Sequence, residues 1–97
     1  LVTPTLSRTA LPIEQDLFEP IEIDGVVAGE VRRNWFPYTM PFNITGHPAM
    51  SVCCGFASDG LPIGLQLVGR FRDEASVLRL GSLYEASTDW HRRWPKL

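Results

Sequence analysis

Two strand-like segments flank a tight-turn signal, and this stretch most constrains how the chain can fold. Residues 49–56 and 62–68 are rich in apolar side chains, and Asp59 and Gly60 stand between them. An Asp-Gly pair between two such runs predicts a β-hairpin, because both residues tolerate the positive φ angles that a tight turn requires. We therefore expect an antiparallel strand pair here.

The second predicted strand has two different faces. Side chains alternate along a strand, so Ile63, Leu65 and Leu67 share one face. The opposite face holds Gly64, Gln66 and Val68. This pattern predicts a sheet with helices on it, in which the Gln66 amide lies on a covered surface.

A strand, a loop and a small hairpin are predicted before residue 33. Residues 1–5 form an apolar and β-branched run, whereas residues 6–20 show no helical period and are predicted to be loop. Residues 21–27 alternate around Asp24 and Gly25, which predicts a second, smaller hairpin.

A short helix is predicted over residues 35–44, where apolar residues are dense. Pro37 would lie in its first turn, and Pro41 would limit its length. Gly46, followed by a proline two residues later, is typical of a helix end in which glycine takes the left-handed conformation.

The clearest helix is predicted from Glu74 to about residue 88. Asp73 is a good N-terminal cap, and Glu74 adds negative charge to the first turn. The predicted apolar stripe consists of Val77, Leu78, Leu80, Leu83 and Tyr84. The aromatic residues Trp90 and Trp94 are expected to cover apolar surface beyond this helix.

Composition restricts the class of protein. The chain has 97 residues, 44% apolar and 21% charged, with a net charge of −2, so it has no positive field for nucleic acid. No apolar run reaches the roughly 18 residues that a transmembrane helix needs. Its two cysteines are neighbours and imply no disulfide framework. We expect a cytoplasmic protein without nucleic-acid or membrane partners.

Two motifs resemble the C-terminal segment of the amidase signature family. Residues 41–49 read Pro-Phe-Asn-Ile-Thr-Gly-His-Pro-Ala, and residues 60–69 read Gly-Leu-Pro-Ile-Gly-Leu-Gln-Leu-Val-Gly. Further matches are Thr3-Pro4-Thr5, Ser51-Val52, Gly55, Glu85, Trp90 and Pro95. The resemblance covers most of the chain and is weakest over residues 6–33.

The resemblance implies an α/β fold, with part of a mixed β-sheet and flanking helices. The expected order is strand, loop with hairpin, short helix, β-hairpin and C-terminal helix. Residues 1–97 would form one C-terminal fragment of an amidase domain, with strand and loop over 1–33 and helix, hairpin and terminal helix over 34–97. The chain starts at Leu1 rather than Met, which favours an absent upstream part.

Membership of this family implies hydrolysis of a carboxylic amide C–N bond by a Ser-cisSer-Lys mechanism without a cofactor. A neutral lysine accepts a proton through the second serine, and backbone amides hold the oxyanion. The chain has no Gly-Ser-Ser-Gly stretch, and its only lysine, Lys96, is next to the C-terminus, where it should be solvated and protonated. We therefore expect no catalytic residue here and no activity from these residues alone.

The other reactive side chains do not suggest a catalytic or metal site. The Ser51 hydroxyl is expected to satisfy a sheet or neighbouring backbone group. His47 is expected in a loop or cap and His91 on the surface, without the aspartate of a triad. Cys53, where the family usually has proline, and Cys54 should point to opposite strand faces as buried, inert thiols. Their spacing also does not fit a zinc site.

Four residues are predicted to contact substrate: Trp35, Phe36, Tyr38 and Thr39. In the family, the stretch before the Asn-x-x-Gly turn lines the substrate funnel, although packing within a helix core would also explain them. Members that take glutamine carry an acidic residue near the position of Phe36, which binds the substrate's amino group. Phe36 cannot form that ion pair, which favours an apolar or aryl amide. The A subunit of a tRNA-dependent amidotransferase is the alternative within the family.

A hypothesis from another class is a stand-alone, non-catalytic module. Such a module would cover an exposed apolar sheet face by forming a homo-oligomer or by binding a partner chain. The amidase hypothesis instead predicts that the missing N-terminal part of the same fold covers that face, and that the parent enzyme binds a small-molecule amide. An initiator Met codon just before Leu1 in the gene would favour the module.

Overall fold

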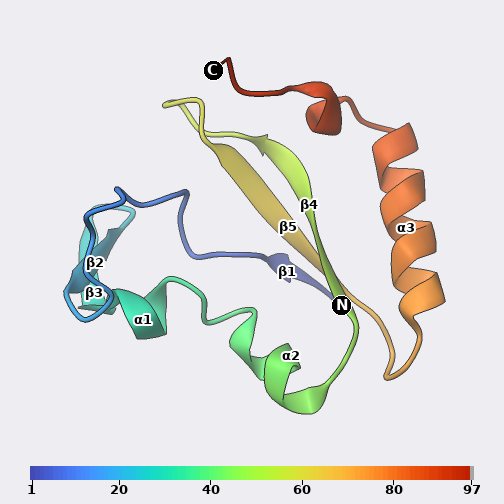
Figure 1. Cartoon of the computed structure of the whole chain (residues 1–97), viewed down its shortest axis with the longest axis horizontal. Coiled ribbons are helices and arrows are strands. Elements are labelled where there is room, and N and C mark those ends of the chain that lie inside the picture. Colours follow the sequence, from blue (N-terminus) through green and yellow to red (C-terminus); the bar gives the residue numbers. More distant parts are fainter. Residues whose placement is uncertain (97) are drawn as a thin grey trace.

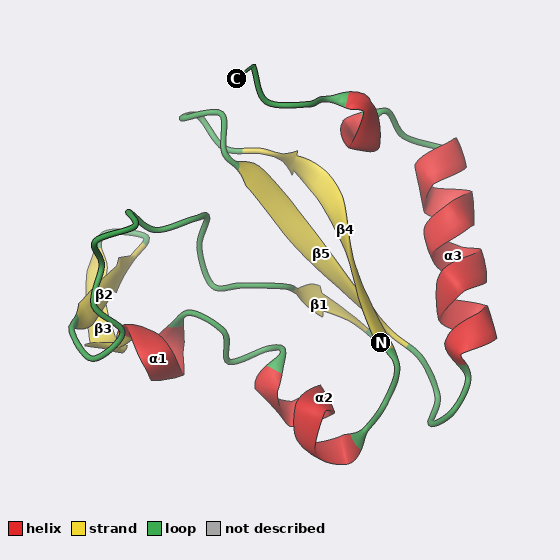
Figure 2. Cartoon of the chain, in the orientation of Figure 1, coloured by secondary structure: helices red, strands yellow, loops and turns green. Residues whose placement is uncertain are grey.

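A computed structural model describes residues 1–96 (Figures 1 and 2). The strands are β1 (Val2–Pro4), β2 (Pro20–Ile23), β3 (Val26–Glu30), β4 (Ala49–Phe56) and β5 (Pro62–Val68). The helices are α1 (Val31–Asn34), α2 (Met40–Thr45), α3 (Glu74–Ala86) and the 3-10 turn η1 (Trp90–Arg92). This mixed α/β arrangement is the predicted class.

The larger sheet places β5 between β1 and β4, antiparallel to both. The predicted β4 and β5 segments are confirmed. Their connection is longer than a two-residue turn, because the backbone N–H of Ala57 donates to the carbonyl of Leu61 and only Gly60 in this loop has a positive φ, of 84°. β1 closes the sheet on the other side, where the Leu1 ammonium donates to the Val68 carbonyl over 2.9 Å.

One face of this sheet packs against α3, and we call it the helix face. It consists of Val2, Pro4, Met50, Val52, Leu65 and Leu67, since directly paired residues on antiparallel strands share a face. Val52 and Leu67 are buried there, as is Val77 of α3. Gly81 lets the helix approach closely, because a Cβ at this position would overlap the Met50 sulfur.

The start of α3 is as predicted, but only part of its apolar stripe is used. The Asp73 carboxylate accepts a hydrogen bond from the backbone N–H of Ser76 over 3.2 Å, which caps the helix. Leu78, Leu80 and Leu83 are 58%, 48% and 58% exposed. Fewer residues of α3 therefore pack against the sheet than the predicted apolar stripe contains.

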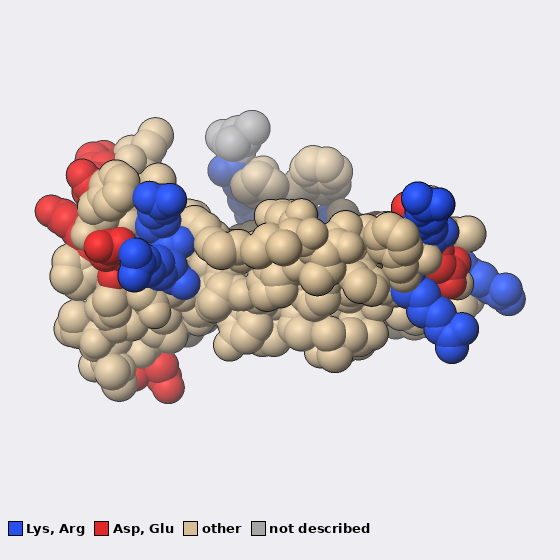
Figure 3. All heavy atoms as spheres, turned by 90° about the horizontal axis from the view of Figure 1, so that it is seen from below, with Lys and Arg blue, Asp and Glu red and all other residues tan. Residues whose placement is uncertain are grey.

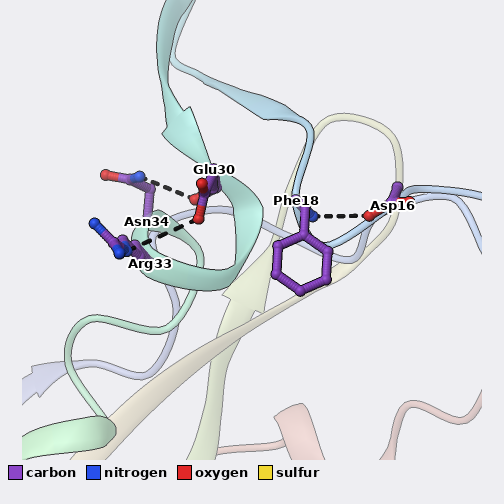
Figure 4. Close-up of polar contacts among 5 residues, drawn as sticks. All are labelled: Asp16, Phe18, Glu30, Arg33 and Asn34. Atoms are coloured by element: carbon purple, nitrogen blue, oxygen red, sulfur yellow. Dashed lines mark hydrogen bonds and ion pairs between the residues drawn. The ribbon is translucent and has the colours of Figure 1, made fainter.

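The smaller hairpin, β2 and β3, forms a second core with α1. Its turn has φ angles of 51° at Asp24 and 76° at Gly25, as the Asp-Gly pair predicts. Ile21 and Val31 are the most buried side chains of the described chain. The polar contacts around this unit are local: Asp16 with Phe18, and Glu30 with Arg33 and Asn34 (Figure 4).

The predicted helix over residues 35–44 is wrong in its first half. Residues 35–39 form turns, and α2 begins at Met40. Pro41 lies in the first turn of α2. N–H groups in this turn have no partner within the helix, so a proline, which lacks the N–H, fits there. Pro37 precedes the helix. Gly46 ends α2 with a φ of 71°, as predicted.

Charge is unevenly distributed on the face shown in Figure 3. Charged side chains gather near the small hairpin at one end and near α3 at the other, with a broad uncharged band between them. Among residues 1–96, no helix has the length and apolar character needed to cross a membrane.

Candidate functional site

The second face of the larger sheet carries hydroxyl and amide groups, and we call it the hydroxyl face. Its residues include Thr3, Thr5, Ser51, Gly64 and Gln66, and the register adds Ala49, Cys53 and Val68. The register explains this grouping, because Thr3 and Ser51 both pair with Gln66 from opposite sides. Three polar side chains from three strands are thereby placed in one row.

Gln66 is the buried polar centre of this face, with only 4% of its surface exposed. Its amide nitrogen donates to the Thr3 hydroxyl and to the Tyr38 carbonyl, each over 2.9 Å. A primary amide has two N–H donors, so both are used. The prediction that Gln66 lies on a covered surface is confirmed, and its second bond holds the turn of residues 35–39 against the sheet.

Thr5 and Ser51 form a hydroxyl pair next to Gln66, with 2.7 Å between their oxygens. Gly64 makes room for this pair. A Cβ at Gly64 would lie 2.8 Å from the Thr5 hydroxyl oxygen and 3.0 Å from that of Ser51. The Ser51 hydroxyl therefore bonds to another side-chain hydroxyl, rather than to the sheet or neighbouring backbone group that the sequence predicts.

Two clefts meet at the hydroxyl pair, since Thr5 and Ser51 line both. The first has a volume of about 470 Å³, and its other walls include Leu6, Trp35, Pro62 and Ile63. The second has a volume of about 360 Å³, and its other walls include Thr39, Phe42, His47 and Gln66. An apolar cleft and a more polar cleft thus share one pair of hydroxyls. This arrangement suits a small ligand that has an apolar part and a polar part.

Two of the four predicted substrate residues line these clefts. Trp35 lines the first, and its indole N–H donates to the Arg8 carbonyl over 3.3 Å. Thr39 lines the second, and its hydroxyl donates to the Phe36 carbonyl over 3.2 Å. Phe36 and Tyr38 do not appear among the residues of either cleft: Phe36 packs near Trp35, with ring centroids 6.4 Å apart, and Tyr38 is 39% exposed.

Sequence reasoning missed Thr5 and Gly64 as site residues and treated Gln66 only as a buried polar group. Their meeting depends on pairing between β1 and β5, which are far apart in the chain. The sequence signal for this site is the apolar alternation around Gln66, because a side-chain amide on a covered face needs hydrogen-bond partners nearby.

The histidines do not contribute to a catalytic cluster. His47 Nδ1 lies 2.9 Å from the Thr45 hydroxyl, and its ring meets that of Phe71 edge-on. His91 is exposed on η1. Across residues 1–96, no three His, Cys, Asp or Glu side chains come together as a set that could hold a metal ion.

The cysteines differ from the prediction of buried thiols on a regular strand. Cys53 and Cys54 are both free and half-buried. Cys53 pairs with Gly64 and Gly55 pairs with Ile63, so Cys54 is an extra residue at a β-bulge. The bulge interrupts the regular alternation that predicted thiols on opposite faces.

Comparison with known proteins places this geometry in a family. A family model described as Amidase matches residues 1–78. The A subunit of glutamyl-tRNA(Gln) amidotransferase from Chloroflexus aggregans is 46% identical over 97 residues, which is 100% of this chain and 18% of that protein. The protein of the same name from Roseiflexus castenholzii is 56% identical over 59 residues, which is 61% of this chain and 12% of that protein.

Solved structures agree. The structure of 6-aminohexanoate cyclic dimer hydrolase has a TM-score of 0.77 at 29% identity and covers 98% of this chain and 20% of its own. A crystal structure of amidase has a TM-score of 0.76 at 29% identity, covering 89% of this chain and 19% of its own. The chain spans about 18% of the length of the curated relative from Chloroflexus aggregans. Sequence and fold together show that the chain belongs to the amidase family.

Proposed function

We propose that this chain is the C-terminal part of an enzyme that hydrolyses a carboxylic amide C–N bond by a Ser-cisSer-Lys mechanism. The observation that carries the proposal is the family match over residues 1–78, together with a fold match that covers almost the whole chain. The catalytic serines and lysine would lie upstream of these 97 residues. Lys96 is exposed and Ser51 is bonded to Thr5, so neither has the setting of the family's catalytic groups.

The proposed role of this part is to form one wall of the substrate site. The turn that carries Trp35, Phe36, Tyr38 and Thr39 would face the substrate, and Gln66 would hold that turn in place through its bond to the Tyr38 carbonyl. The apolar wall of the first cleft favours an apolar or aryl amide.

A second candidate is the A subunit of a tRNA-dependent amidotransferase. The 46% identity to the A subunit of glutamyl-tRNA(Gln) amidotransferase over the whole chain favours it. Phe36 opposes it, because an aromatic ring cannot pair with the amino group of glutamine as the expected acidic residue would. Substrate preference therefore separates the two candidates.

The exposed leucines of α3 support a larger parent fold. Leu78, Leu80 and Leu83 present apolar surface on the described chain, and we propose that the N-terminal part of the amidase covers it. A homo-oligomer of this chain is the competing arrangement, in which a second copy covers the same surface. Light scattering of the 97-residue chain distinguishes them, because the first predicts a monomer or non-specific aggregates and the second a defined oligomer.

The test of activity compares the 97-residue chain with a polypeptide that also contains the upstream part. Benzamide and glutamine serve as substrates, with ammonia release as the measurement. We expect no turnover from the 97 residues and, from the longer polypeptide, a kcat/KM for benzamide at least about tenfold above that for glutamine, a difference of about 1.4 kcal/mol. Turnover by the shorter chain would refute the upstream location of the catalytic residues.

Phe36 provides the matched variants for substrate choice. Phe36→Asp in the longer polypeptide should raise kcat/KM for glutamine relative to benzamide, whereas Phe36→Leu should leave that ratio near its original value. A wild-type preference for glutamine would favour the amidotransferase candidate.

A further inference from the structure

An aromatic cleft lies where η1 meets the end of the β4–β5 hairpin. Its volume is about 420 Å³, and its walls include Phe56, Pro62, Trp90 and Trp94. Phe56 and Trp90 are half-buried, with ring centroids 6.2 Å apart and ring planes at 56° to each other. Trp94 is 83% exposed. The cleft therefore has one partly buried aromatic wall and one ring open to solvent, and its volume is in the range of small-molecule sites.

One cation lies over this aromatic wall. The guanidinium carbon of Arg93 is 4.9 Å from the Trp90 ring centroid and 5.7 Å from that of Phe56, so the guanidinium makes cation–π contacts with both rings. Arg93 also lines the cleft. A guanidinium that stacks on aromatic rings keeps the N–H groups at its edge, and these can bind a carboxylate through two parallel hydrogen bonds. Arg93 can therefore hold an anion at the aromatic wall.

The charge of Arg93 is not neutralised by an ion pair within residues 1–96. The two aspartates next in sequence to cleft residues have other partners. Asp59 accepts a hydrogen bond from the backbone N–H of Leu61 over 3.0 Å, and a carboxylate oxygen of Asp89 lies 3.6 Å from the Arg92 guanidinium. The cleft thus combines aromatic surface with a positive charge that the negative charge of a ligand would complement.

We propose that this cleft binds small aromatic carboxylates. The Arg93 guanidinium pairs with the carboxylate, and the ring of the ligand packs on the aromatic walls of the cleft. Hydrolysis of an aryl amide releases an acid of this class, and this link to a product rests on the proposed function. Binding at the cleft does not depend on the reaction, because Arg93 and the aromatic rings alone provide it.

The first test measures binding of 2-naphthoate by isothermal titration calorimetry to the polypeptide that also contains the upstream part. Arg93→Met keeps an unbranched apolar side chain without the charge and should weaken binding at least about tenfold. The matched control is Arg92→Met, since Arg92 pairs with Asp89 and does not line the cleft. Its affinity should change by less than about twofold, and circular dichroism checks the fold of each variant. No binding to the unsubstituted polypeptide, unchanged binding in Arg93→Met or equal losses in both variants would overturn the site.

The second test varies the ligand. The alcohol 2-naphthylmethanol keeps the rings without the charge, and cyclohexanecarboxylate keeps the charge without an aromatic ring. Each should bind at least about tenfold more weakly than 2-naphthoate. In Arg93→Met the advantage of 2-naphthoate over the alcohol should disappear, whereas Trp94→Ala should keep it and weaken both ligands about threefold. Equal affinity of the unsubstituted polypeptide for 2-naphthoate and the alcohol would refute the carboxylate contact at Arg93.

The link to the proposed reaction is tested separately. Ammonia release from benzamide by the same polypeptide reports the reaction, whereas calorimetry with 2-naphthoate reports the cleft. Binding without ammonia release would support the site and refute only its link to a product. Ammonia release without binding would support the proposed function and overturn the site.

Discussion

The two faces of the larger sheet are stabilised in different ways. On the helix face, buried apolar side chains such as Leu67 meet α3, which approaches most closely at Gly81. On the hydroxyl face, individual hydrogen bonds from Gln66 and between Thr5 and Ser51 hold the chain, and open clefts remain between them. A cleft of about 340 Å³ also opens beside the helix face, with Leu67, Val77 and Leu80 among its walls, but no pair of hydroxyls of the described chain lines it. The hydroxyl face instead joins two clefts at the Thr5 and Ser51 hydroxyls, which suits it to a ligand with polar and apolar parts.

The largest effect should come from filling the close approach on the helix face. Gly81→Leu should lower the free energy of unfolding by about 2 to 3 kcal/mol, because the new side chain must displace Met50 or lift α3 from the sheet. Ser82→Leu places the same residue on the exposed side of α3 and should change stability by less than about 0.5 kcal/mol. Urea denaturation measures both. Equal losses would mean that α3 is not held at Gly81.

Loss of the buried amide should have the next largest effect. Gln66→Met keeps the approximate shape of the side chain but leaves the Tyr38 carbonyl without its donor, which should cost about 1 to 3 kcal/mol. The control is Gln15→Met, since the Gln15 amide donates only to the neighbouring Asp16 carbonyl. If the two substitutions destabilise the chain equally, Gln66 does not hold the turn of residues 35–39.

The hydroxyl pair should contribute less, because it is partly solvated. Thr5→Val and Ser51→Ala each remove one partner of the 2.7 Å contact. Each should cost up to about 1 kcal/mol, and the double variant should cost less than the sum, with a coupling of about 0.5 kcal/mol or more. Strict additivity in this double-mutant cycle would show that the pair makes no energetic contribution.

The smallest effect is a dependence on alkaline pH at the edge of the helix face. The raised pKa of Tyr84 means that the folded chain holds the phenolic proton more tightly than the unfolded chain does. Above about pH 10 the unfolded state releases more protons, so stability should fall as pH rises. Tyr84→Phe should show a shallower fall in stability, measured by urea denaturation, between pH 9 and pH 11, about one unit on either side of the ordinary tyrosine pKa. Identical slopes would contradict this contribution.

Local signals predicted most of the helix face. The bounds of β4 and β5 and the Asp73 cap of α3 follow from alternation, turn residues and capping, all of which act over a few residues. The width of the α3 contact could not be predicted, because an apolar stripe does not say how much of it meets a partner. That depends on which segments cover the helix.

The hydroxyl face was harder to predict, because it is assembled from distant parts of the chain. The pattern of residues 35–39 predicts helix, yet these residues form a turn whose Tyr38 carbonyl accepts a hydrogen bond from Gln66, 28 positions later. Similarly, the cysteine prediction assumed a regular strand, and the bulge at Cys54 is set by how β4 pairs with β5. Neither the Gln66–Tyr38 hydrogen bond nor the β4–β5 register at Cys54 can be predicted from neighbouring residues, because each depends on a separate segment of the chain.

The position of β5 between β1 and β4 has a consequence for the order of assembly. β4 and β5 are joined by a short loop, so their pairing costs little chain entropy. β1 reaches β5 across most of the chain, as the 63-residue separation of Thr3 and Gln66 shows. We therefore expect the hairpin to form early and β1 to dock late. The hydroxyl face would then exist only in the last state of folding, since it needs Thr3 and Thr5 in place.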